Sequence, residues 1–401
     1  SSVTFENCIL QNDQTKMYCI FGSKSSDITF TNSKIISSNY IGILVAEESK
    51  LEVTGSELYN TENSCIYSSG SNNVSVISSN LHDSKCNGIY VKDETSLFVD
   101  SCTFTRNGSA CVYVDNFSSL EIKKCTFSEL KRPAITISDS FNTLVSECEI
   151  FDCQDTTISV FAGTLIMKDT KIRDTRGNCI FLTSSSHAEI TGGELSSSDY
   201  PAIILVNGCD GTLKDLVIKD VNESGLVLRS SSTIKAENVS IINAKHVGIK
   251  ISDAENAEFK GCYVDGCGLD CVNICDLSTV KFNDCFIGGA QEYCFSIYTG
   301  SDVSIENSII YGPYNKPACY IHRGGDAQIV GCGFAKTKNE AVQILPSFPQ
   351  ITNGNITKGM TIKKGKFVRP TEFEKNINEQ VLKIDTKRPV FISKCFIFGE
   401  P

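Results

Sequence analysis

The chain has 401 residues, and 47 acidic against 37 basic side chains give it a net charge of −10 at pH 7. This balance argues against nonspecific nucleic-acid binding, which needs a basic surface. No apolar run reaches 18 residues, so we expect no membrane-spanning helix. Length alone would allow two or three domains, but a strict repeat predicts one elongated domain.

The chain repeats a unit of 23 residues, which we call a phrase. Each phrase opens with a small residue, followed by an apolar residue, a free position and a second apolar residue, as in Gly88-Ile89-Tyr90-Val91. Twelve of the fourteen intervals between openings are 23 residues, and the others are 22 and 24. The opening residues are Cys19, Gly42, Cys65, Gly88, Cys111, Ala134, Thr157, Cys179, Ala202, Gly225, Gly248, Cys271, Cys294, Ala318 and Ala341.

Each phrase is built for strands. A second alternating segment starts nine residues after the opening (Leu97 and Val99 after Gly88), and a third short one follows at Cys102 and Phe104. Alternation at a spacing of two predicts strands, and the Ser, Asn, Asp and Gly between segments form turns. No phrase has an apolar stripe at helical spacing, which excludes ankyrin and tetratricopeptide repeats. Leucine-rich repeats share the period, but they have one Leu-rich strand per unit.

Three short strands per 23 residues make one turn of a three-sided coil, so we predict an all-β, single-stranded parallel β-helix of about 16 turns. The phrase resembles the right-handed parallel β-helix superfamily, which includes pectate-lyase-like proteins, NosD/CASH-type repeat proteins and the substrate-binding domain of some F-box proteins. The resemblance implies a right-handed coil. It leaves the function open, because this architecture hosts many functions.

In chain order, residues 1–10 are the tail of an incomplete turn, so we expect the natural N-terminus to lie before Ser1. Residues 1–344 are predicted as the regular β-helix. After Ile344 the second-segment phrase returns ten residues late at Met360, and seven more extra residues fall within 368–380. We interpret 345–401 as the last turns with two loop insertions, forming either a C-terminal cap over open strand edges or a binding loop.

Twenty cysteines suggest a disulfide-rich secreted protein until they are placed in the repeat. Fourteen of them fall in two slots that other phrases fill with Ser, Thr, Gly or Ala, so we expect buried free thiols and a reducing compartment. We therefore expect a cytoplasmic protein, in which a cytoskeletal or ciliary assembly would fit. A secreted or cell-surface protein is the alternative. The chain has six glycosylation sequons, at Asn73, Asn107, Asn116, Asn222, Asn238 and Asn355, but a chain this rich in Asn, Ser and Thr contains about that many by chance, so they do not establish secretion.

The free position of the opening strand points outward, yet it carries three successive tyrosines and later an apolar run. Exposed apolar patches of this kind usually mark an interface. A stacked ladder that only stabilises the sheet and sugar-ring recognition are the alternatives. The predicted binding residues are Tyr67, Tyr90, Tyr113, Phe181, Ile204 and Val227.

Two charged groups are weaker candidates. An acidic column just after the opening strand could ligate Ca²⁺ or act as an acid–base pair, although turn chemistry is the commoner explanation; it comprises Asp93, Asp139, Asp253 and Asp276. A basic stretch could hold an anionic partner or be a solvated cap; it comprises Lys363, Lys364, Lys366 and Arg369. We expect no metal and no cofactor.

Catalytic signals are sparse. The four histidines fall in distant phrases, which leaves His322, followed by Arg323 and near Asp326, as a lone acid–base candidate. Cys267, Cys271 and Cys275 have a zinc-like spacing, but they cannot converge on extended backbone. The polygalacturonase-type phrases N-T-D, G-H-D and R-I-K are absent, as is Trp.

We therefore predict a noncatalytic scaffold or interaction module that binds a protein partner along the opening-strand face, within a larger assembly. The first alternative is a carbohydrate-active protein, either a polysaccharide lyase or a glycoside hydrolase, which the resemblance implies. The second is an extracellular adhesin, which glycan occupancy at Asn107 or Asn222 would support.

Overall fold

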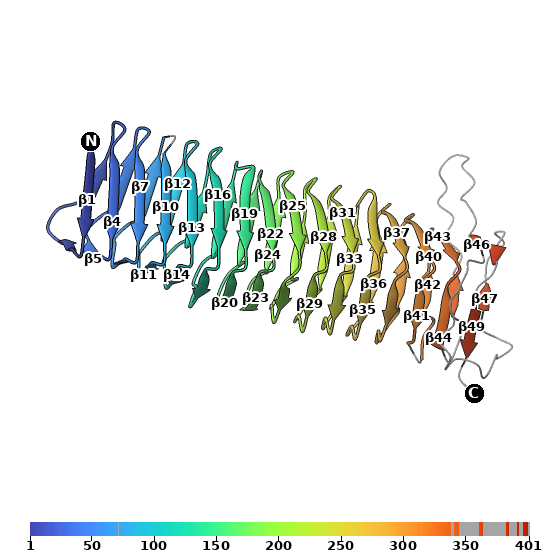
Figure 1. The fold of residues 1–401 in the computed structure, drawn as a ribbon. Coiled ribbons are helices and arrows are strands. Elements are labelled where there is room, and N and C mark those ends of the chain that lie inside the picture. The colour runs from blue at the N-terminus through green and yellow to red at the C-terminus, as the bar shows by residue number, and fades with distance from the viewer. Residues whose placement is uncertain are drawn as a thin grey trace. The chain divides into compact units, whose positions relative to one another are not determined.

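The computed structural model describes residues 1–70, 72–313, 315–337 and 341–344, and the strand backbones at 361–363, 382–384, 391–392 and 396–399. Within these residues every regular element is a β-strand (Figure 1). No helix in this described part is long and apolar enough to cross a membrane. The chain forms two compact units, Ser1–Asp199 (unit 1) and Tyr200–Pro401 (unit 2).

Unit 1 coils through three parallel sheets, visited in the order C, A, B in every turn. Sheet C holds the opening strands β3 (Ile20–Gly22), β6 (Ile43–Ala46), β9 (Ile66–Ser69), β12 (Ile89–Lys92), β15 (Val112–Val114), β18 (Ile135–Ser138), β21 (Ile158–Phe161) and β24 (Ile180–Thr183). Sheet A holds β1 (Ser2–Glu6), β4 (Asp27–Thr31), β7 (Lys50–Thr54), β10 (Asn73–Ile77), β13 (Ser96–Asp100), β16 (Ser119–Lys123), β19 (Asn142–Ser146), β22 (Thr164–Lys168) and β25 (His187–Thr191). Sheet B holds β2 (Ile9–Asn12), β5 (Lys34–Ser38), β8 (Glu57–Tyr59), β11 (Asn80–His82), β14 (Thr103–Thr105), β17 (Thr126–Ser128), β20 (Glu149–Cys153), β23 (Lys171–Thr175) and β26 (Glu194–Ser196).

Unit 2 also consists of three parallel sheets, C, A and B. Its sheet C holds β27 (Ile203–Leu205), β30 (Leu226–Arg229), β33 (Ile249–Ser252), β36 (Val272–Cys275), β39 (Phe295–Ile297), β42 (Cys319–Ile321), β45 (Val342–Ile344) and β47 (Leu382–Ile384). Sheet A holds β28 (Asp210–Lys214), β31 (Thr233–Glu237), β34 (Ala257–Lys260), β37 (Thr279–Asn283), β40 (Asp302–Glu306), β43 (Asp326–Val330), β46 (Thr361–Lys363) and β48 (Phe391–Ile392). Sheet B holds β29 (Val217–Lys219), β32 (Ser240–Ile242), β35 (Tyr263–Asp265), β38 (Phe286–Gly288), β41 (Ile309–Tyr311), β44 (Gly333–Thr337) and β49 (Phe396–Gly399).

Each strand pairs in parallel with its counterpart one turn later, so the sequence repeat is also the pairing register. Ile66 pairs with Ile89, and Ile89 with Val112, an offset of 23 residues. The two irregular intervals appear as well, with 22 residues between Ile158 and Ile180 and 24 between Phe295 and Cys319. The predicted all-β parallel coil with three short strands per turn is confirmed.

The core lies between the three sheets of each unit and is filled by the inward residue of every alternating pair. Phe104 and Phe127 are buried in unit 1, with ring centroids 4.8 Å apart. Phe259 and Phe282 form the same stack in unit 2 at 4.7 Å. Truncating one buried Phe to Ala typically costs about 3–5 kcal/mol. The fold therefore depends on these columns rather than on the outer surface.

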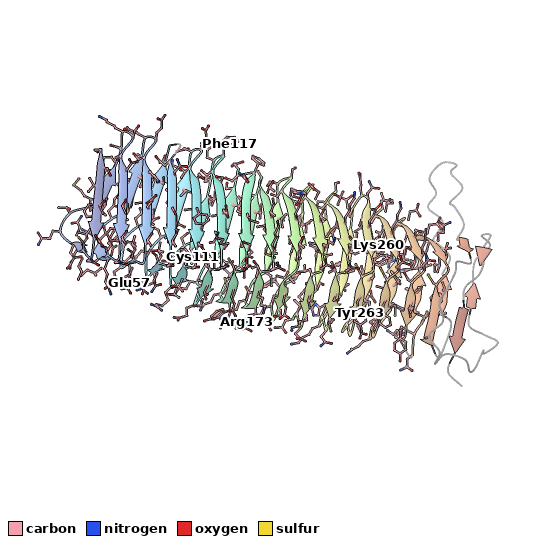
Figure 2. All side chains as sticks on the ribbon, in the orientation of Figure 1. Glu57, Cys111, Phe117, Arg173, Lys260 and Tyr263 are labelled. Carbon is pink, nitrogen blue, oxygen red and sulfur yellow. The ribbon has the colours of Figure 1, made fainter. Side chains whose placement is uncertain are left out.

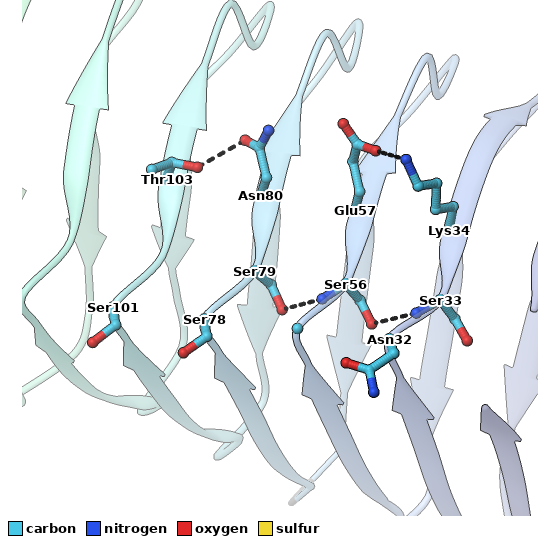
Figure 3. Close-up of a pocket in the computed structure, with 11 residues that line it drawn as sticks. Asn32, Ser33, Lys34, Ser56, Glu57, Ser78, Ser79, Asn80, Ser101 and Thr103 are labelled. Atoms are coloured by element: carbon cyan, nitrogen blue, oxygen red, sulfur yellow. Dashed lines mark hydrogen bonds and ion pairs between the residues drawn. The ribbon is translucent and has the colours of Figure 1, made fainter. Parts of the chain in front are cut away.

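A slot at the corner between sheets A and B explains why Cys, Ser and Thr interchange. The Ser33 N–H donates to Ser56 Oγ, and the Ser56 N–H to Ser79 Oγ, both at 3.1 Å (Figure 3). One turn on, the Ser79 N–H donates to Cys102 Sγ at 3.4 Å. The slot residue in turn donates to the carbonyl two positions earlier. A small side chain that can accept one hydrogen bond and donate another therefore suits this slot. The thiols of Cys102 and Cys125, which occupy it, are free.

Four strand backbones are described within 345–401, and each pairs in parallel with a strand of an earlier turn. Ile362 pairs with Ile329, Ile384 with Ile344, Ile392 with Ile362 and Ile397 with Phe334. The two predicted loop insertions and the predicted cap lie outside the described residues. So do the side chains of the basic stretch, Lys363, Lys364, Lys366 and Arg369.

Candidate binding surfaces

The predicted tyrosine column lies on the outer face of sheet C in unit 1, with Tyr67, Tyr90 and Tyr113 in register. The Tyr90 and Tyr113 rings stack with centroids 4.9 Å apart and planes 13° apart, and Tyr67 meets Tyr90 edge-on at 5.2 Å. The Tyr90 hydroxyl donates to Asp115 Oδ2 at 3.1 Å. Desolvation, assisted by Asp115, raises the pKa of Tyr90 well above its usual value. The rings largely cover one another, so a partner would reach mainly their edges.

The remaining members of the column fit a binding face less well than the sequence suggested. Phe181 in unit 1 and Ile204 in unit 2 are half-buried. Val227, in register with Ile204, is only 2% exposed, which corrects the prediction that it lies on an open face. Its short side chain sits between the longer Ile204 and Lys250 in the same column, and long side chains cover such a position.

The acidic column is held in turns. Asp93, Asp139, Asp253 and Asp276 all have a left-handed backbone, with φ between 44° and 58°, a conformation that Asp tolerates better than most residues. Asp93 accepts hydrogen bonds from Ser69 Oγ at 2.5 Å and Asn116 Nδ2 at 2.6 Å, and these lower its pKa. No group of three or more His, Cys, Asp or Glu side chains in the described part of the chain could hold a metal ion. The geometry supports turn chemistry for the column.

An exposed apolar surface that the sequence did not single out lies at the corner between sheets C and A of unit 1. We call it the Phe ridge. It comprises Phe117, Phe141 and Phe161, whose side chains are 65%, 58% and 39% exposed (Figure 2 labels Phe117). Three successive turns carry them: the Phe117 N–H donates to the Asp139 carbonyl at 2.7 Å, and the Asp139 N–H to the Phe161 carbonyl at 3.0 Å. The rings of Phe117 and Phe141 are 6.3 Å apart.

The backbone at Phe117 makes this ridge unusual. Its φ is 61°, where bulky residues are outliers. The same corner position holds Glu48, Glu94 and Ser185 elsewhere in unit 1, at similar φ. The signal in the sequence was therefore a bulky apolar residue where other turns place small or polar ones. This signal is weak, because corner residues ordinarily serve only to form the turn.

Unit 2 carries an aromatic cluster around His322 on the outer face of sheet C. Tyr293 and Tyr320 stack with centroids 4.7 Å apart and planes 11° apart. The His322 ring lies 4.5 Å from Tyr320 and 4.9 Å from Tyr298. Burial, with a smaller contribution from Arg323, lowers the pKa of His322. The imidazole is therefore neutral near pH 7 and able to accept a proton.

A buried carboxylate supports this cluster. Asp270 accepts hydrogen bonds from Asn273 Nδ2 at 2.8 Å and from the Tyr293 N–H at 3.1 Å, and desolvation raises its pKa. The Tyr298 hydroxyl donates to Asn273 Oδ1 at 2.9 Å. The sequence singled out His322 alone. Tyr293, Tyr298 and Asp270 escaped notice because they flank the outward column rather than occupy it.

A polar groove of about 450 Å³ lies at the corner between sheets A and B of unit 1 (Figure 3). Lys34 Nζ lies 2.7 Å from Glu57 Oε2, and Thr103 Oγ1 donates to Asn80 Oδ1 at 2.9 Å. The groove residues thus bond to one another. They are Asn32, Ser33, Lys34, Gly55, Ser56, Glu57, Ser78, Ser79, Asn80, Ser101 and Thr103.

An ion-pair network continues from this groove across sheet B. His82 Nε2 lies 3.2 Å from Glu57 Oε1, and His82 Nδ1 lies 2.6 Å from Asp83 Oδ2. Arg106 donates hydrogen bonds from Nε and Nη2 to the two carboxylate oxygens of Asp83, both at 2.8 Å, and its Nη1 lies 3.1 Å from Glu129 Oε2. Arg106, followed by His82, lowers the pKa of Asp83 to about 2. The charges of this surface are therefore already paired.

The sequon Asn107 is buried, which corrects its use as a glycan site. Its Nδ2 donates to the Leu81 carbonyl at 3.2 Å, and its Oδ1 accepts from Ser84 Oγ at 2.7 Å. A glycan on this nitrogen would break the corner it holds. Asn222, the other sequon proposed to support an adhesin, is exposed.

Comparisons with known proteins identify the architecture. The family model described as "Right handed beta helix region" matches residues 18–167 and 162–310. Among solved structures, the periplasmic alginate epimerase AlgG shares 11% identity, with 78% of this chain and 77% of that chain covered at a TM-score of 0.47. The Azotobacter vinelandii mannuronan C-5 epimerase AlgE6 A-module shares 11% identity, with 80% and 88% covered, also at 0.47.

A tailspike protein mutant of E. coli bacteriophage HK620, in complex with a pentasaccharide, shares 12% identity, with 80% and 74% covered at a TM-score of 0.34. These likenesses concern the fold and carry no argument about activity. No curated protein matches the chain. The family model spans most of the chain, from residue 18 to residue 310, and the strand pairing repeats throughout that range. The chain therefore belongs to the right-handed β-helix family.

Proposed function

We propose that the chain is a noncatalytic interaction module that binds a protein partner through the Phe ridge. The observation that carries this proposal is Phe117, a bulky apolar side chain that is 65% exposed on a left-handed backbone. Neither the core nor the turn needs an aromatic residue there, because the equivalent corners at Glu48, Glu94 and Ser185 of unit 1 use Glu or Ser. Phe141 follows on the next turn, with its ring centroid 6.3 Å from that of Phe117, and Phe161 is exposed one turn further on. Exposed aromatics of this kind are typical interface anchors.

The proposed surface differs from the tyrosine column of sheet C. Stacking between Tyr90 and Tyr113 and the Tyr90–Asp115 hydrogen bond already engage the column. The ridge instead presents ring surface that the protein leaves in water. Burying an exposed Phe side chain in an interface stabilises a complex by about 25 cal/mol per Å² of apolar area, before the costs of association.

Site-specific photo-crosslinking tests this proposal. A benzoylphenylalanine probe replaces Phe117 or, separately, Phe141 in the chain expressed in its own cells. The matched control replaces Leu277 of unit 2, which has φ of 60° and is 77% exposed at the equivalent corner. We expect one protein adduct shared by the two ridge positions and absent from the control. No adduct at either ridge position, or the same adducts at all three, would overturn the proposal.

A second candidate is a carbohydrate-active protein that uses the aromatic cluster of unit 2. The observation that favours it is the His322 ring packed against the rings of Tyr298 and Tyr320, of which Tyr298 belongs to a hydrogen-bonded network with Asn273 and Asp270. A neutral imidazole can act as a general base, and tyrosine rings and amides are suited to a sugar ring and its hydroxyls.

Incubation with polyuronates, followed by assays for unsaturated sugar and new reducing ends, tests this candidate. We expect product from the wild type and none from His322→Ala. His246→Ala is the matched control, because His246 lies in the same unit and contacts Glu223 at 3.5 Å. Product formation that survives His322→Ala would remove the cluster from consideration.

A further inference from the structure

The charges around the Phe ridge indicate what kind of protein segment it accepts. The segments that lead from sheet C to sheet A are residues 115–118, 138–141 and 161–164 on the three turns of the ridge, and residues 92–94 on the turn before them. They contain four carboxylates, on Asp93, Glu94, Asp115 and Asp139, against one lysine, Lys92. Lys92 lies 3.5 Å from Asp93, which also accepts hydrogen bonds from Ser69 and Asn116. The exposed rings are thus bordered by negative charge.

Given the proposed function, on which this inference rests, we propose that the ridge binds a cationic segment of a partner protein. In that segment Lys or Arg alternates with apolar side chains. The apolar side chains of that segment would cover the rings of Phe117 and Phe141, and its cations would face Asp93, Asp115 and Asp139. Complementary charge of this kind accelerates association and excludes acidic partners. Cations also bind well over the face of exposed aromatic rings.

The same charges argue against a lipid surface as the occupant. Aromatic side chains on a protein corner can enter a bilayer interface, but peripheral binding usually adds basic residues that face anionic headgroups. The three corner segments that carry the rings, residues 115–118, 138–141 and 161–164, contain two carboxylates and no Lys or Arg. We therefore favour a protein segment as the occupant, and the experiment below includes binding to lipid vesicles as a result that would contradict it.

The test measures fluorescence anisotropy of two labelled twelve-residue peptides, one alternating Lys with Leu and the other Glu with Leu, against the full chain. We expect the Lys peptide to bind at least tenfold more tightly than the Glu peptide. We expect binding to weaken at least tenfold in Phe117→Ser/Phe141→Ser and severalfold in Asp139→Asn. Asn keeps the left-handed backbone of Asp139, so this second variant should fold. Leu277→Ser is the matched control and should leave the affinity unchanged.

Three results would overturn the inference. In the first, the Lys peptide binds the ridge variant as tightly as the wild type, which would make the interaction a general effect of net charge. In the second, both peptides bind alike. In the third, vesicles of phosphatidylcholine with phosphatidylserine bind through the ridge, whereas the Lys peptide does not. If the crosslinked partner still requires the ridge in any of these cases, the proposed function stands and only the cationic class fails. If no partner crosslinks, the proposed function fails by itself.

Discussion

At the residue scale, exposure separates two kinds of phenylalanine in this chain. Phe127 is fully buried and stacks on Phe104 in the core of unit 1, whereas Phe117 projects into water from a strained corner. The same side chain type therefore has a structural role in one place and a surface role in the other.

Substitution should expose this difference. We expect Phe117→Ser to change the free energy of unfolding by less than about 1 kcal/mol, because surface changes have small effects and other corners use Ser. We expect Phe127→Ala to cost about 3–5 kcal/mol. Denaturant titration followed by circular dichroism gives both values. A loss at Phe117 comparable to that at Phe127 would mean that the ridge is part of the core.

Asn107 provides a second contrast. We expect Asn107→Ala to destabilise the chain by about 1–3 kcal/mol, because it leaves the Leu81 carbonyl and the Ser84 N–H without their partners. Asn73→Ala, at an exposed sequon on strand β10, should have an effect within about 0.5 kcal/mol. Thermal unfolding compares the two variants. Equal stabilities would show that the hydrogen bonds of Asn107 contribute nothing.

At the element scale, one small side chain at the corner between sheets A and B links several neighbouring turns of unit 1. Cys125 Sγ accepts from the Cys102 N–H at 3.4 Å and donates to the Lys123 carbonyl at 3.2 Å. We expect Cys125→Ser to be tolerated within about 1 kcal/mol and Cys125→Val to cost about 1–3 kcal/mol, since Val leaves the Cys102 N–H unsatisfied. Chemical denaturation distinguishes them. Equal losses for both variants would mean that side-chain volume alone sets the slot.

The Asp83–Arg106 pair on sheet B should make stability depend on pH. The folded state lowers the pKa of Asp83 from 3.8 to about 2, so its contribution is complete above about pH 4 and disappears as the pH falls through 2. Both side chains are at least one-third exposed, so the contribution is at most about 1 kcal/mol. We expect Asp83→Asn to be less stable than the wild type at pH 7 and equally stable near pH 2. A gap that widens toward low pH would contradict this.

The strands and their register could be predicted from the sequence, but the corners could not. The alternation around Ile66, Ile89 and Val112 decides which side chains face inward, and a fixed period decides their partners. The exposure of Phe117 depends instead on turn conformation. The burial of Val227 depends on how long its column neighbours are, and the aromatic cluster depends on side chains that lean across turns. Periodicity contains none of that information.

At the scale of the whole molecule, the two candidate functions are assigned to different units. The Phe ridge belongs to unit 1 and the aromatic cluster to unit 2. Repeat proteins distribute stability over neighbouring turns, so distant surface changes act independently. We expect Phe117→Ser/Phe141→Ser to abolish partner binding without affecting any carbohydrate activity, and His322→Ala to do the reverse. Paired binding and activity assays on both variants check this. Loss of both functions in either variant would show that the surfaces are coupled.

The central claim, that the ridge is the contact surface, is tested most directly by calorimetric titration of the crosslinked partner, purified, into the full chain. We compare the wild type, Phe117→Ser/Phe141→Ser and the control Leu277→Ser at low and high salt. We expect affinity to fall at least tenfold in the ridge variant alone, and wild-type affinity to weaken as salt screens the corner carboxylates. Equal affinities for all three proteins would contradict it.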